Sequence, residues 1–578
     1  MLKSKLIKKT DIYLKSSPNL KDYQQIYSGF TYSKYHDQLS WFPDNHLNAA
    51  YNAIDRQAQG KRKNKVALYW HGPEDQQQKF TFLELSLLSN QFANILKQLQ
   101  VEKHDRVFFF LPRYPELYYG FLGTLKIGAI AGTLFSAFGE QALEDRLNNS
   151  DASVLITNSD LLPRVKKILP KLPHLKHILV TDIKTHQKQF ISLPLMMQSA
   201  SQKLHPSHTQ PTDPAFMLYT SGTTGKPKGV IHQHYAILHE HLTTKWVLDI
   251  KDSDVYWCTA DPGWVTGIAY EILGSWSNGA SALVYAGRFS PEKWYQLIEQ
   301  YKVNVWYTAP TAIRMLAASG LDIVKQFDLS SLRHLASVGE PLNPEAIYWG
   351  LKAFKLPFHD NWWQTETGGI MIANFPCLDI KPGSMGKPVP GITAAILDDK
   401  GKPLPIGQEG NLAIKAGWPS MMQKIWRRPK KYASYFIKGW YISGDRAWQD
   451  KDGYFWFIGR GDDVIKTAGE RVGPFEVESS LVSYPQIIEA AVIGKPDPLR
   501  GEIIKAFITL KAGVKPSESL KQKIMEYVKK NLAGHAYPRE IEFRDKLPKT
   551  RSGKIMRRLL KAQELGLPIG DTSTLEEF

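Results

Sequence analysis

Short apolar runs alternate with amphipathic segments over the first two thirds of the chain. In residues 82–99 the apolar positions recur at the spacing of one helix face, whereas residues 107–111 form a continuous apolar run that Pro112 ends. The first pattern is typical of a helix with one buried face, and the second of a buried strand. Strands that alternate with helices in this way indicate parallel, doubly wound sheets.

The pattern predicts two such α/β series. The first has strands at 66–70, 107–111, 129–134 and 153–157, and helices at 48–55, 82–99, 116–126 and 140–147. The second has strands at 255–259, 282–285, 303–307 and 332–338, with helices between them. Hydrophobic periodicity does not reveal which strands are neighbours, so the strand order stays open.

The pattern changes twice toward the C-terminus. From Gly386, short strands such as 394–397 and 411–414 are separated by frequent Gly and Pro, which predicts a small β-rich subdomain. Charged residues and Gly interrupt the apolar pattern at 460–463, and mixed strands and helices follow at 489–493, 503–510, 520–531 and 541–543.

We therefore predict an α/β fold with two domains. The large N-terminal domain, residues 1–461, should contain two doubly wound α/β subdomains and the β-rich subdomain. A smaller, mobile α+β domain should span 462–578, with a hinge at Asp462, which is an ordinary domain size. Residues 1–45 are polar and aromatic without a clear period, and we expect them to form an arm that wraps the body.

The bulk composition narrows the class of protein. A chain of 578 residues is too long for one core. Its formal net charge of +17 could attract anionic substrates or nucleic acid, but the Lys/Arg-dense blocks are short and lack interleaved aromatic residues. An evenly spread basic surface is the favoured interpretation, and no nucleic-acid partner is expected.

The cysteines and the N-terminus bear on the compartment. The only two cysteines, Cys258 and Cys377, lie far apart, so neither a disulfide framework nor a zinc site is expected, which fits a reducing compartment. Residues 1–15 are charged and have no apolar core, so no signal peptide is predicted. The longest apolar window, 128–138, is too short to span a membrane. We expect a cytoplasmic protein without membrane contact.

The first candidate for chemistry is the segment 219–230, YTSGTTGKPKGV, which follows an apolar run at 215–218 that reads as a strand about to end. Glycines let backbone N–H groups turn inward around an anion, and hydroxyls and lysines add donors. This chemistry suits a polyphosphate; the alternative is a polar surface hairpin. It is not a Walker loop, because Gly222 and Gly225 are only three apart and Pro227 restricts Lys226 to extended conformations.

Three later segments carry further candidates. In 360–369, DNWWQTETGG, Glu366 could hold magnesium, or the tryptophans could be core and Glu366 a helix cap. In 441–445, YISGD, Asp445 follows a strand and could accept both ribose hydroxyls. In 547–558, LPKTRSGKIMRR, Lys554 should lie on an exposed loop before a basic helix, for which a solvated basic tail is the alternative.

These four motifs, in this order, resemble those of the adenylate-forming enzymes: acyl-CoA synthetases, luciferases and peptide-synthetase adenylation domains. The resemblance covers nearly the whole chain, from about residue 47 to 560. It implies that ATP, with Mg²⁺, activates a carboxylic acid to an acyl adenylate and that a thiol then takes the acyl group. It also implies that the C-terminal domain turns about Asp462 between the two steps.

The resemblance assigns roles to individual residues. Lys554 would contact the carboxylate and phosphate during adenylation, Glu366 would hold magnesium, and Asp445 would bind ribose. The ATP- or AMP-binding positions that it implies are Thr220, Ser221, Gly222, Thr223, Thr224, Gly225, Lys226, Gly339, Glu340, Pro341, Asp360, Asn361, Trp362, Trp363, Gln364, Thr365, Asp445, Arg460 and Arg471. Because Lys554 is exposed and essential in this scheme, we also expect it to be a target for a protein lysine acetyltransferase and deacetylase.

The acid and the acceptor follow from smaller details of the resemblance. Trp363 stands where medium-chain relatives carry glycine, and the acyl pocket would be lined by Trp264, Val265, Thr266, Val338 and Trp363. So small a pocket implies acetate, with propionate or butyrate as alternatives. The expected acceptor is free CoA, with Ala468, Gly469 and Lys529 as contacts, since no carrier motif follows residue 560. Lys529 departs from the family, which has arginine there, and no clear match exists for its arginine-rich CoA segment.

The sequence leaves two other functional hypotheses open. One is a CoA ligase for another short- to medium-chain acid or for an aryl acid, which the size of the pocket at Trp363 would distinguish. The other is a non-catalytic nucleotide-binding or basic-surface regulator, against which the intact Glu366, Asp445 and Lys554 argue.

Overall fold

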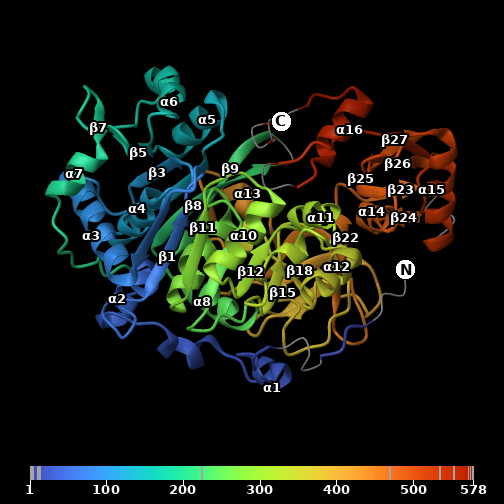
Figure 1. Cartoon of the computed structure of the whole chain (residues 1–578), viewed down its shortest axis with the longest axis horizontal. Coiled ribbons are helices and arrows are strands. Elements are labelled where there is room, and N and C mark those ends of the chain that lie inside the picture. Colours follow the sequence, from blue (N-terminus) through green and yellow to red (C-terminus); the bar gives the residue numbers. More distant parts are fainter. Residues whose placement is uncertain are drawn as a thin grey trace.

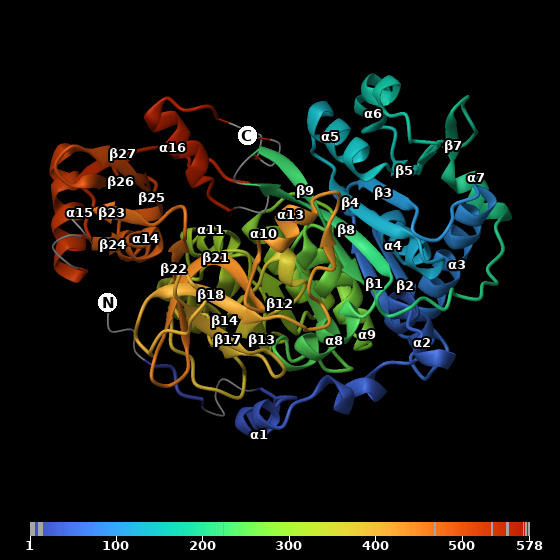
Figure 2. The same ribbon diagram turned by 180° about the vertical axis from the view of Figure 1, so that it is seen from behind.

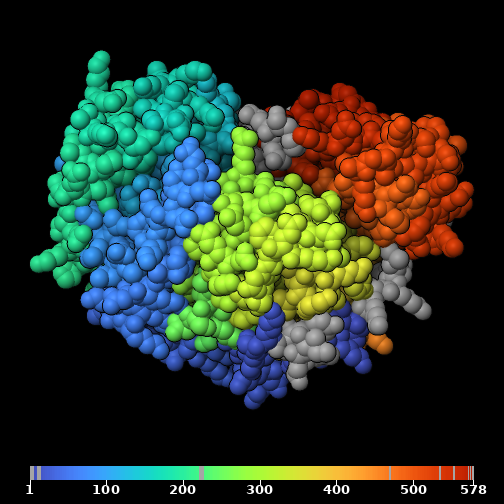
Figure 3. Space-filling model, viewed as in Figure 1, coloured from blue at the N-terminus to red at the C-terminus, as the bar shows by residue number. Residues whose placement is uncertain are grey.

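The computed structural model of the chain describes residues 6–9, 15–222, 225–467, 470–532, 536–550 and 554–569, together with Thr572 and Leu575. A large body holds the first three quarters of the chain, and a smaller C-terminal lobe, orange to red in Figures 1 and 2, lies against one side of it. The space-filling view in Figure 3 shows this lobe beside the segments coloured green and yellow.

The first α/β subdomain is built on an eight-stranded sheet of order β19-β9-β8-β4-β3-β5-β6-β7. The six strands from β8 to β7 are parallel, while β9 and β19 add antiparallel strands at one edge. The strands are β3 (Arg106–Leu111), β4 (Ile130–Phe135), β5 (Val154–Thr157), β6 (His177–Val180), β7 (Phe190–Ser192), β8 (Pro214–Gly222), β9 (Gly225–Gln233) and β19 (Lys424–Ile425). The helices are α3 (Phe82–Gln98), α4 (Pro115–Lys126), α5 (Glu140–Ser150), α6 (Leu162–Ile168) and α7 (Leu193–Ser199).

The second subdomain contains a nine-stranded sheet of order β16-β15-β14-β13-β12-β10-β11-β1-β2. Its strands are β1 (Val66–His71), β2 (Gln77–Thr81), β10 (Val255–Cys258), β11 (Ser281–Tyr285), β12 (Val305–Thr308), β13 (His334–Ser337), β14 (Phe358–Trp362), β15 (Ile372–Ala373) and β16 (Lys387–Pro388). Its helices include α8 (Ala236–Trp246), α9 (Ser275–Ser277), α10 (Pro291–Tyr301), α11 (Pro310–Ala318) and α12 (Pro344–Phe354). The buried indoles of Trp257 and Trp306 stack at 6.1 Å in its core.

One strand assignment was wrong. The strand at 66–70 was placed in the first series, but β1 lies in the second sheet, where it pairs in parallel with β11. The reason is a long-range pairing, Leu68 with Ala282, that a local apolar pattern cannot reveal. The helices predicted at 82–99, 116–126 and 140–147 are confirmed as α3, α4 and α5. That at 48–55 is a π-helical turn, η3 (Tyr51–Asp55), running into α2 (Arg56–Ala58).

Two smaller sheets complete the fold. The β-rich subdomain has the order β17-β18-β21-β20, with β22 beside β21, and its strands are β17 (Ala394–Leu397), β18 (Gly410–Lys415), β20 (Phe436–Ile437), β21 (Trp440–Gln449) and β22 (Phe455–Arg460). The C-terminal lobe comprises β23 (Ile465–Thr467), β24 (Glu470–Val472), α14 (Pro474–Val482), β25 (Ile487–Asp497), β26 (Gly501–Leu510), α15 (Glu518–Asn531), β27 (Glu540–Phe543) and α16 (Arg557–Leu565). The mixed α/β class with a small β-rich subdomain and an α+β C-terminal lobe is thus confirmed.

The N-terminal segment runs along the lower edge of the body in Figure 1. Ile7 forms an isolated bridge with Ile380, and α1 (Tyr23–Ser28) buries the ring of Tyr23. Leu20 and Leu39 are also buried, so apolar anchors hold this otherwise polar segment against the body. Among the described helices, none combines the length and apolar character needed to cross a membrane.

A buried ion pair ties three helical elements of the first subdomain together. Lys126, at the end of α4, has no solvent exposure, and its ammonium lies 2.7 Å from the Asp55 carboxylate at the end of η3. The same ammonium donates to Asn90 Oδ1 at 2.7 Å and to the carbonyl of Ser86, both on α3. Burial lowers the pKa of Lys126, and Asp55 opposes that shift.

Replacing Lys126 with methionine should destabilise the first subdomain. The change leaves the Asp55 carboxylate buried without its cation, which typically costs about 3–5 kcal/mol. We expect the Tm in a thermal unfolding scan to fall by on the order of 10 °C. Adding Asp55→Asn to Lys126→Met should restore part of the loss, because no unpaired charge then remains; strictly additive losses would contradict this account.

Candidate active site

The glycine-rich segment is the tip of a β-hairpin. β8 continues through Tyr219 and Thr220 to Gly222, further than the strand end predicted after residue 218, and β9 returns antiparallel from Gly225. Ser221 and Lys226 therefore lie within strands, while Thr223 and Thr224 lie outside the described residues. A segment that opens into a strand, rather than a helix, confirms that this is not a Walker loop. The hydroxyl of Thr220 is buried and has no hydrogen-bond partner among the described residues.

The base of this hairpin reaches the second motif through a lysine and a tyrosine. The Lys228 ammonium donates to the Tyr435 hydroxyl at 2.7 Å and lies 4.0 Å from Glu366 Oε1. The Tyr435 hydroxyl donates to the same Glu366 oxygen at 3.3 Å. Burial lowers the pKa of Lys228, and the negative charge of Glu366 opposes that shift. Lys228 and Tyr435 were not among the predicted site residues, although Lys228 belongs to the segment that was singled out.

Asp445 is the point where the nine-stranded sheet meets the β-rich subdomain. Its Oδ2 accepts hydrogen bonds from the Trp362 indole at 2.9 Å and from the Gln364 amide at 3.0 Å. Its Oδ1 lies 3.2 Å from the Arg460 guanidinium. Burial raises the pKa of the Asp445 carboxyl, while Arg460 and the Trp362 hydrogen bond oppose this. The structure thus brings four predicted residues together around one buried carboxylate.

Two cationic side chains, Arg460 and Lys554, act electrostatically on the Asp445 carboxylate. Burial would lower the pKa of Arg460, but Asp445, Asp462 and Glu366 reverse this and raise it. Lys554 has an exposed side chain on the turn before α16, where its N–H donates to Thr550 Oγ1 at 3.1 Å. Loss of hydration near the surrounding protein lowers the pKa of its ammonium, and Arg460 adds to the shift. Asp445 acts in the opposite direction, so the ammonium lies within electrostatic range of that carboxylate.

The ends of β13 and β14 lie next to each other and carry several of the candidate ATP- or AMP-binding residues. Ser337 pairs with Asp360, and Gly339 just beyond β13 has a φ of 103°, a conformation that glycine adopts without strain. The Glu340 carboxylate accepts from Thr311 at 2.7 Å and from Arg314 at 3.1 Å, which fixes the turn before Pro341. Ligands of α/β sheets bind at such carboxyl ends of strands.

Asp360 and Asn361 leave buried polar atoms unpaired at this edge. Asp360 Oδ1 and Asn361 Nδ2 have no hydrogen-bond partner among the described residues. Burial raises the pKa of Asp360 well above its ordinary value. Unpaired buried polar atoms are costly unless a ligand or water satisfies them, so their presence here supports a polar ligand.

Trp363 is fixed in place by two tyrosines. Its indole N–H donates to the Tyr307 hydroxyl at 3.3 Å, and its ring meets Tyr270 edge-on at 5.0 Å between centroids. Val265 and Val338 belong to the same hydrophobic cluster as these rings, and Thr266 precedes the π-helix η5 (Gly267–Gly274). Trp264 instead packs on Phe135 at 4.9 Å, in a different cluster, so the structure separates it from the other predicted pocket residues.

Of the remaining candidates, Arg471 and Lys529 lie in the C-terminal lobe, Asp462 lies in the connection that leads to it, and Thr365 lies in the large body. Arg471 is exposed on β24, and Lys529 is exposed near the end of α15, with its ammonium 5.5 Å from the Tyr537 ring centre. Ala468 and Gly469 lie outside the described residues. Asp462 is 4.0 Å from Arg460, in the connection between β22 and β23. Thr365 begins the short turn η7 (Thr365–Thr367), which carries Glu366.

Glu366 fits a magnesium ion that is shared with a substrate. Within the described ranges, no cluster of three or more His, Cys, Asp or Glu side chains could hold a metal by itself. Mg²⁺ in phosphate-handling sites needs only one or two carboxylates, because substrate phosphates and water fill its other positions. Glu366 Oε2 accepts no hydrogen bond from a described residue, so the carboxylate retains that capacity.

Comparisons with known proteins cover almost the whole chain. Residues 54–426 match the family model of the AMP-binding enzymes, and residues 476–554 match that of the AMP-binding enzyme C-terminal domain. The chain is 56% identical to the acetyl-coenzyme A synthetase of Bacillus subtilis (strain 168), over 97% of this chain and 98% of that protein. It is 43% identical to the acetyl-coenzyme A synthetase of Methanothrix thermoacetophila, over 93% and 86% of the two chains.

A solved structure agrees with both the sequence relatives and the observed architecture. The crystal structure of the anthranilate CoA ligase AuaEII in complex with anthranoyl-AMP matches with a TM-score of 0.85 at 33% identity, covering 93% of this chain and 99% of that one. The glycine-rich hairpin, the Asp445 centre and the C-terminal lobe thus occur in a chain that matches both family models, and it belongs to the AMP-binding enzyme family.

Proposed function

We propose that this protein is an acetate–CoA ligase that forms AMP. The observation that carries the proposal is the 56% identity, over nearly its full length, to a protein named acetyl-coenzyme A synthetase. The buried Asp445 centre and the fixed Trp363 ring support it, because they would suit a nucleotide site and a wall for a small acid.

The first step would join acetate to the nucleotide. An acetate oxygen attacks the α-phosphorus of ATP, the bond from that phosphorus to the bridging oxygen breaks, and pyrophosphate leaves with the electron pair. Charge builds up on the phosphoryl oxygens in the transition state, so fixed cations accelerate the step. Lys554 would supply one such cation, and the hydroxyls and N–H groups of the β8–β9 hairpin would hold the leaving phosphates.

Asp445 would orient the ribose. A carboxylate has about four lone-pair sites, and Trp362, Gln364 and Arg460 occupy three of them. Two ribose hydroxyls can therefore both donate only if Arg460 withdraws from Oδ1. The partly exposed Arg460 side chain has room to do so, and its guanidinium would then be available for the nucleotide phosphate.

Magnesium would be held by Glu366 together with substrate phosphates, and when bound it would neutralise charge on the pyrophosphate leaving group. In this arrangement Lys228 and Tyr435 position the Glu366 carboxylate from the hairpin side.

The second step would transfer the acetyl group to CoA. The thiolate attacks the acyl carbon of acetyl-AMP, a new carbon–sulfur bond forms, and the bond from that carbon to the phosphate oxygen breaks to release AMP. We propose Ala468, Gly469 and Lys529 as CoA contacts. We place the domain boundary at 461/462 with Asp462 as the hinge; the short connection between β22 and β23 supports that position.

Regulation and location follow as parts of the same proposal. Acetylation would remove the positive charge of Lys554, and its exposed side chain makes it accessible to a protein acetyltransferase and deacetylase. We propose a cytoplasmic location, which is supported by two cysteines that are both free and buried.

The deciding experiment is acid-dependent exchange of pyrophosphate into ATP with a panel of carboxylic acids. Exchange that is fastest with acetate supports the proposal, and exchange that is fastest with butyrate or an aromatic acid shifts it to another acid–CoA ligase. No exchange with any acid would leave only a nucleotide-binding role.

Trp363→Gly should widen the range of acids. Removing the indole opens volume beside Tyr270, so kcat/KM for butyrate should rise and that for acetate should fall, since each methylene is worth about 1–3 kcal/mol. Steady-state kinetics with straight-chain acids test this. Trp264→Ala is the matched control, because this indole packs on Phe135 and its loss should leave the preference for acetate in place. An unchanged chain-length preference in Trp363→Gly would refute the pocket assignment.

The pH dependence of adenylation should report on Lys554. Adenylation needs Lys554 in its charged ammonium form, and the pKa of this ammonium is lowered. As the pH rises, pyrophosphate exchange should therefore decline at a lower pH than it would if Lys554 had the pKa of an ordinary lysine. Lys554→Arg stays charged and should shift that decline to higher pH, because guanidinium does not titrate there. Lys554→Gln should slow exchange by about 10²–10³-fold. Lys554→Gln should leave the rate of thioester formation from supplied acetyl-AMP and CoA unchanged. An equal loss of rate in both steps would contradict a role of Lys554 in adenylation alone.

A further inference from the structure

A polar cavity of about 550 Å³ lies between the N-terminal segment and the second subdomain. None of its lining residues belongs to the candidate active site. Its walls come from the N-terminal segment, the turn after α2, helix α8, the loop at 250–252 and the end of α9. Elements far apart in the sequence thus converge on one solvent-accessible cavity, which is of the size that holds small ligands.

Positive charge exceeds negative charge around this cavity. Five cationic side chains line it (Arg56, Lys61, Arg62, Lys245 and Lys251), against two carboxylates, Asp37 and Asp252. Arg62 is paired with Asp252, and Lys251 lies 2.9 Å from Asp249 behind the wall. Arg56 and Lys61 form no ion pair with any described residue.

Arg56 is a half-buried cation held by neutral groups. Its guanidinium donates to the carbonyl of Gln38 and, at 2.7 Å, to the carbonyl of Ser277. These two bonds use two of its five N–H groups, and neither acceptor carries a charge. Burial lowers the pKa of Arg56 to about 10, and the neighbouring Arg62 acts in the same direction.

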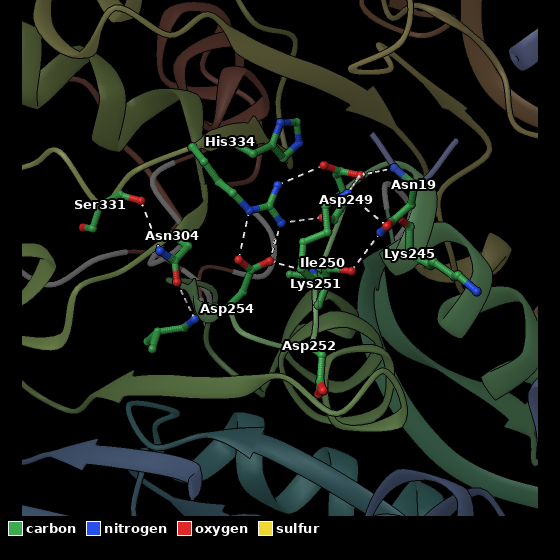
Figure 4. A network of polar contacts seen from close by, with 12 residues as sticks. Asn19, Lys245, Asp249, Ile250, Lys251, Asp252, Asp254, Asn304, Ser331 and His334 are labelled. Atoms are coloured by element: carbon green, nitrogen blue, oxygen red, sulfur yellow. Dashed lines mark hydrogen bonds and ion pairs between the residues drawn. The ribbon is translucent and has the colours of Figure 1, made fainter. Parts of the chain in front are cut away.

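Lys245 brings more positive potential to the same place, and its charge and that of Arg56 act on the neighbouring His241 imidazole, which is neutral near pH 7. The Lys245 ammonium donates to the Gln38 side-chain carbonyl at 2.9 Å. Figure 4 shows that this ammonium and the Asp252 carboxylate point away from the network that joins Asn19, Asp249 and Lys251. Burial lowers the pKa of the His241 imidazole to about 3, and Arg56 and Lys245 add to the shift.

We propose that this cavity binds a small phosphate-bearing anion. An excess of cations from separate elements favours a ligand with two or more negative charges, and guanidinium and ammonium groups bind phosphate through charge-assisted hydrogen bonds. Gln57, Ser277 and Asn278 add neutral polar groups suited to oxygen-rich ligands. No Phe, Tyr or Trp ring lines the cavity to stack on a base, so inorganic pyrophosphate or a sugar phosphate fits better than a nucleotide.

The site can be tested by calorimetry on the full-length chain saturated with ATP in the absence of acetate, so that the nucleotide site and the proposed position of the leaving phosphates are both filled. Inorganic phosphate, pyrophosphate and ribose 5-phosphate are titrated without metal. We expect at least one of them to bind, and Lys61→Gln with Lys245→Gln to raise its Kd at least tenfold. This pair avoids Arg56, whose loss would also break contacts with Gln38 and Ser277.

Lys63→Gln is the matched control, because Lys63 is exposed in the same turn as Lys61 but does not line the cavity. Its Kd should equal that of the unaltered protein, and turnover with acetate, ATP and CoA should be the same in all these variants. Crystals soaked with tungstate should show density between Arg56, Arg62 and Lys245. Binding of none of the three anions, equal Kd values in the double variant and the control, or tungstate only at the β8–β9 hairpin would overturn the proposal.

Discussion

The arrangement of this site depends on the hydrogen bonds and the ion pair that the buried Asp445 carboxylate forms. A carboxylate with so little exposure must be satisfied by hydrogen bonds or cations, and its partners come from separate segments of the chain. Trp362 and Gln364 bring the end of β14 to it, and Arg460 brings the end of β22. Because β22 is the last strand before the C-terminal lobe, the same carboxylate also fixes where that lobe is attached.

The Asp445 carboxylate also influences two nearby cationic side chains, Arg460 and Lys554. The pKa of Asp445 is raised and that of Lys554 is lowered, so each group is held in an environment that disfavours its charge. The positive charge of Arg460 favours the ionised form of Asp445 and disfavours the charged form of Lys554. A phosphate that drew Arg460 away would relieve the repulsion on Lys554 while leaving Asp445 free for hydroxyl donors. In the proposed site, nucleotide binding and the position of Arg460 would therefore be coupled.

The local sequence pattern predicted many of the helices and strands of this fold, but few of the pairings between strands. The apolar face of α3 was visible in the sequence, and the structure adds that Thr81 and Glu84 form its capping box. The partner of β1 was not visible, because it lies more than two hundred residues further along the chain. In the site, residue types indicated Asp445 and Glu366, but only the structure shows that Lys228 and Tyr435 reach Glu366. The sequence also grouped residues that the structure separates. Trp264 and Val265 are adjacent in the predicted pocket motif, but their side chains pack in different hydrophobic clusters, which a linear motif cannot reveal.

In the proposed site, the preference for a small acid would depend on an indole, that of Trp363, which is held in one orientation. Trp363 donates to Tyr307, whose own hydroxyl donates to Asn361 Oδ1 at 2.8 Å, so the indole is linked back to β14. Tyr270, which meets the indole edge-on, accepts from the Ile370 N–H at 2.6 Å and contacts Thr243 at 2.9 Å. Rotating the indole to admit a longer chain would break its hydrogen bond to Tyr307 and its edge-on contact with Tyr270. The lost hydrogen bond alone would cost about 1–3 kcal/mol if its groups stayed buried and unpaired, which is comparable to the discrimination that one methylene provides. Rigidity of the wall, as much as its volume, therefore supports selection of the acid.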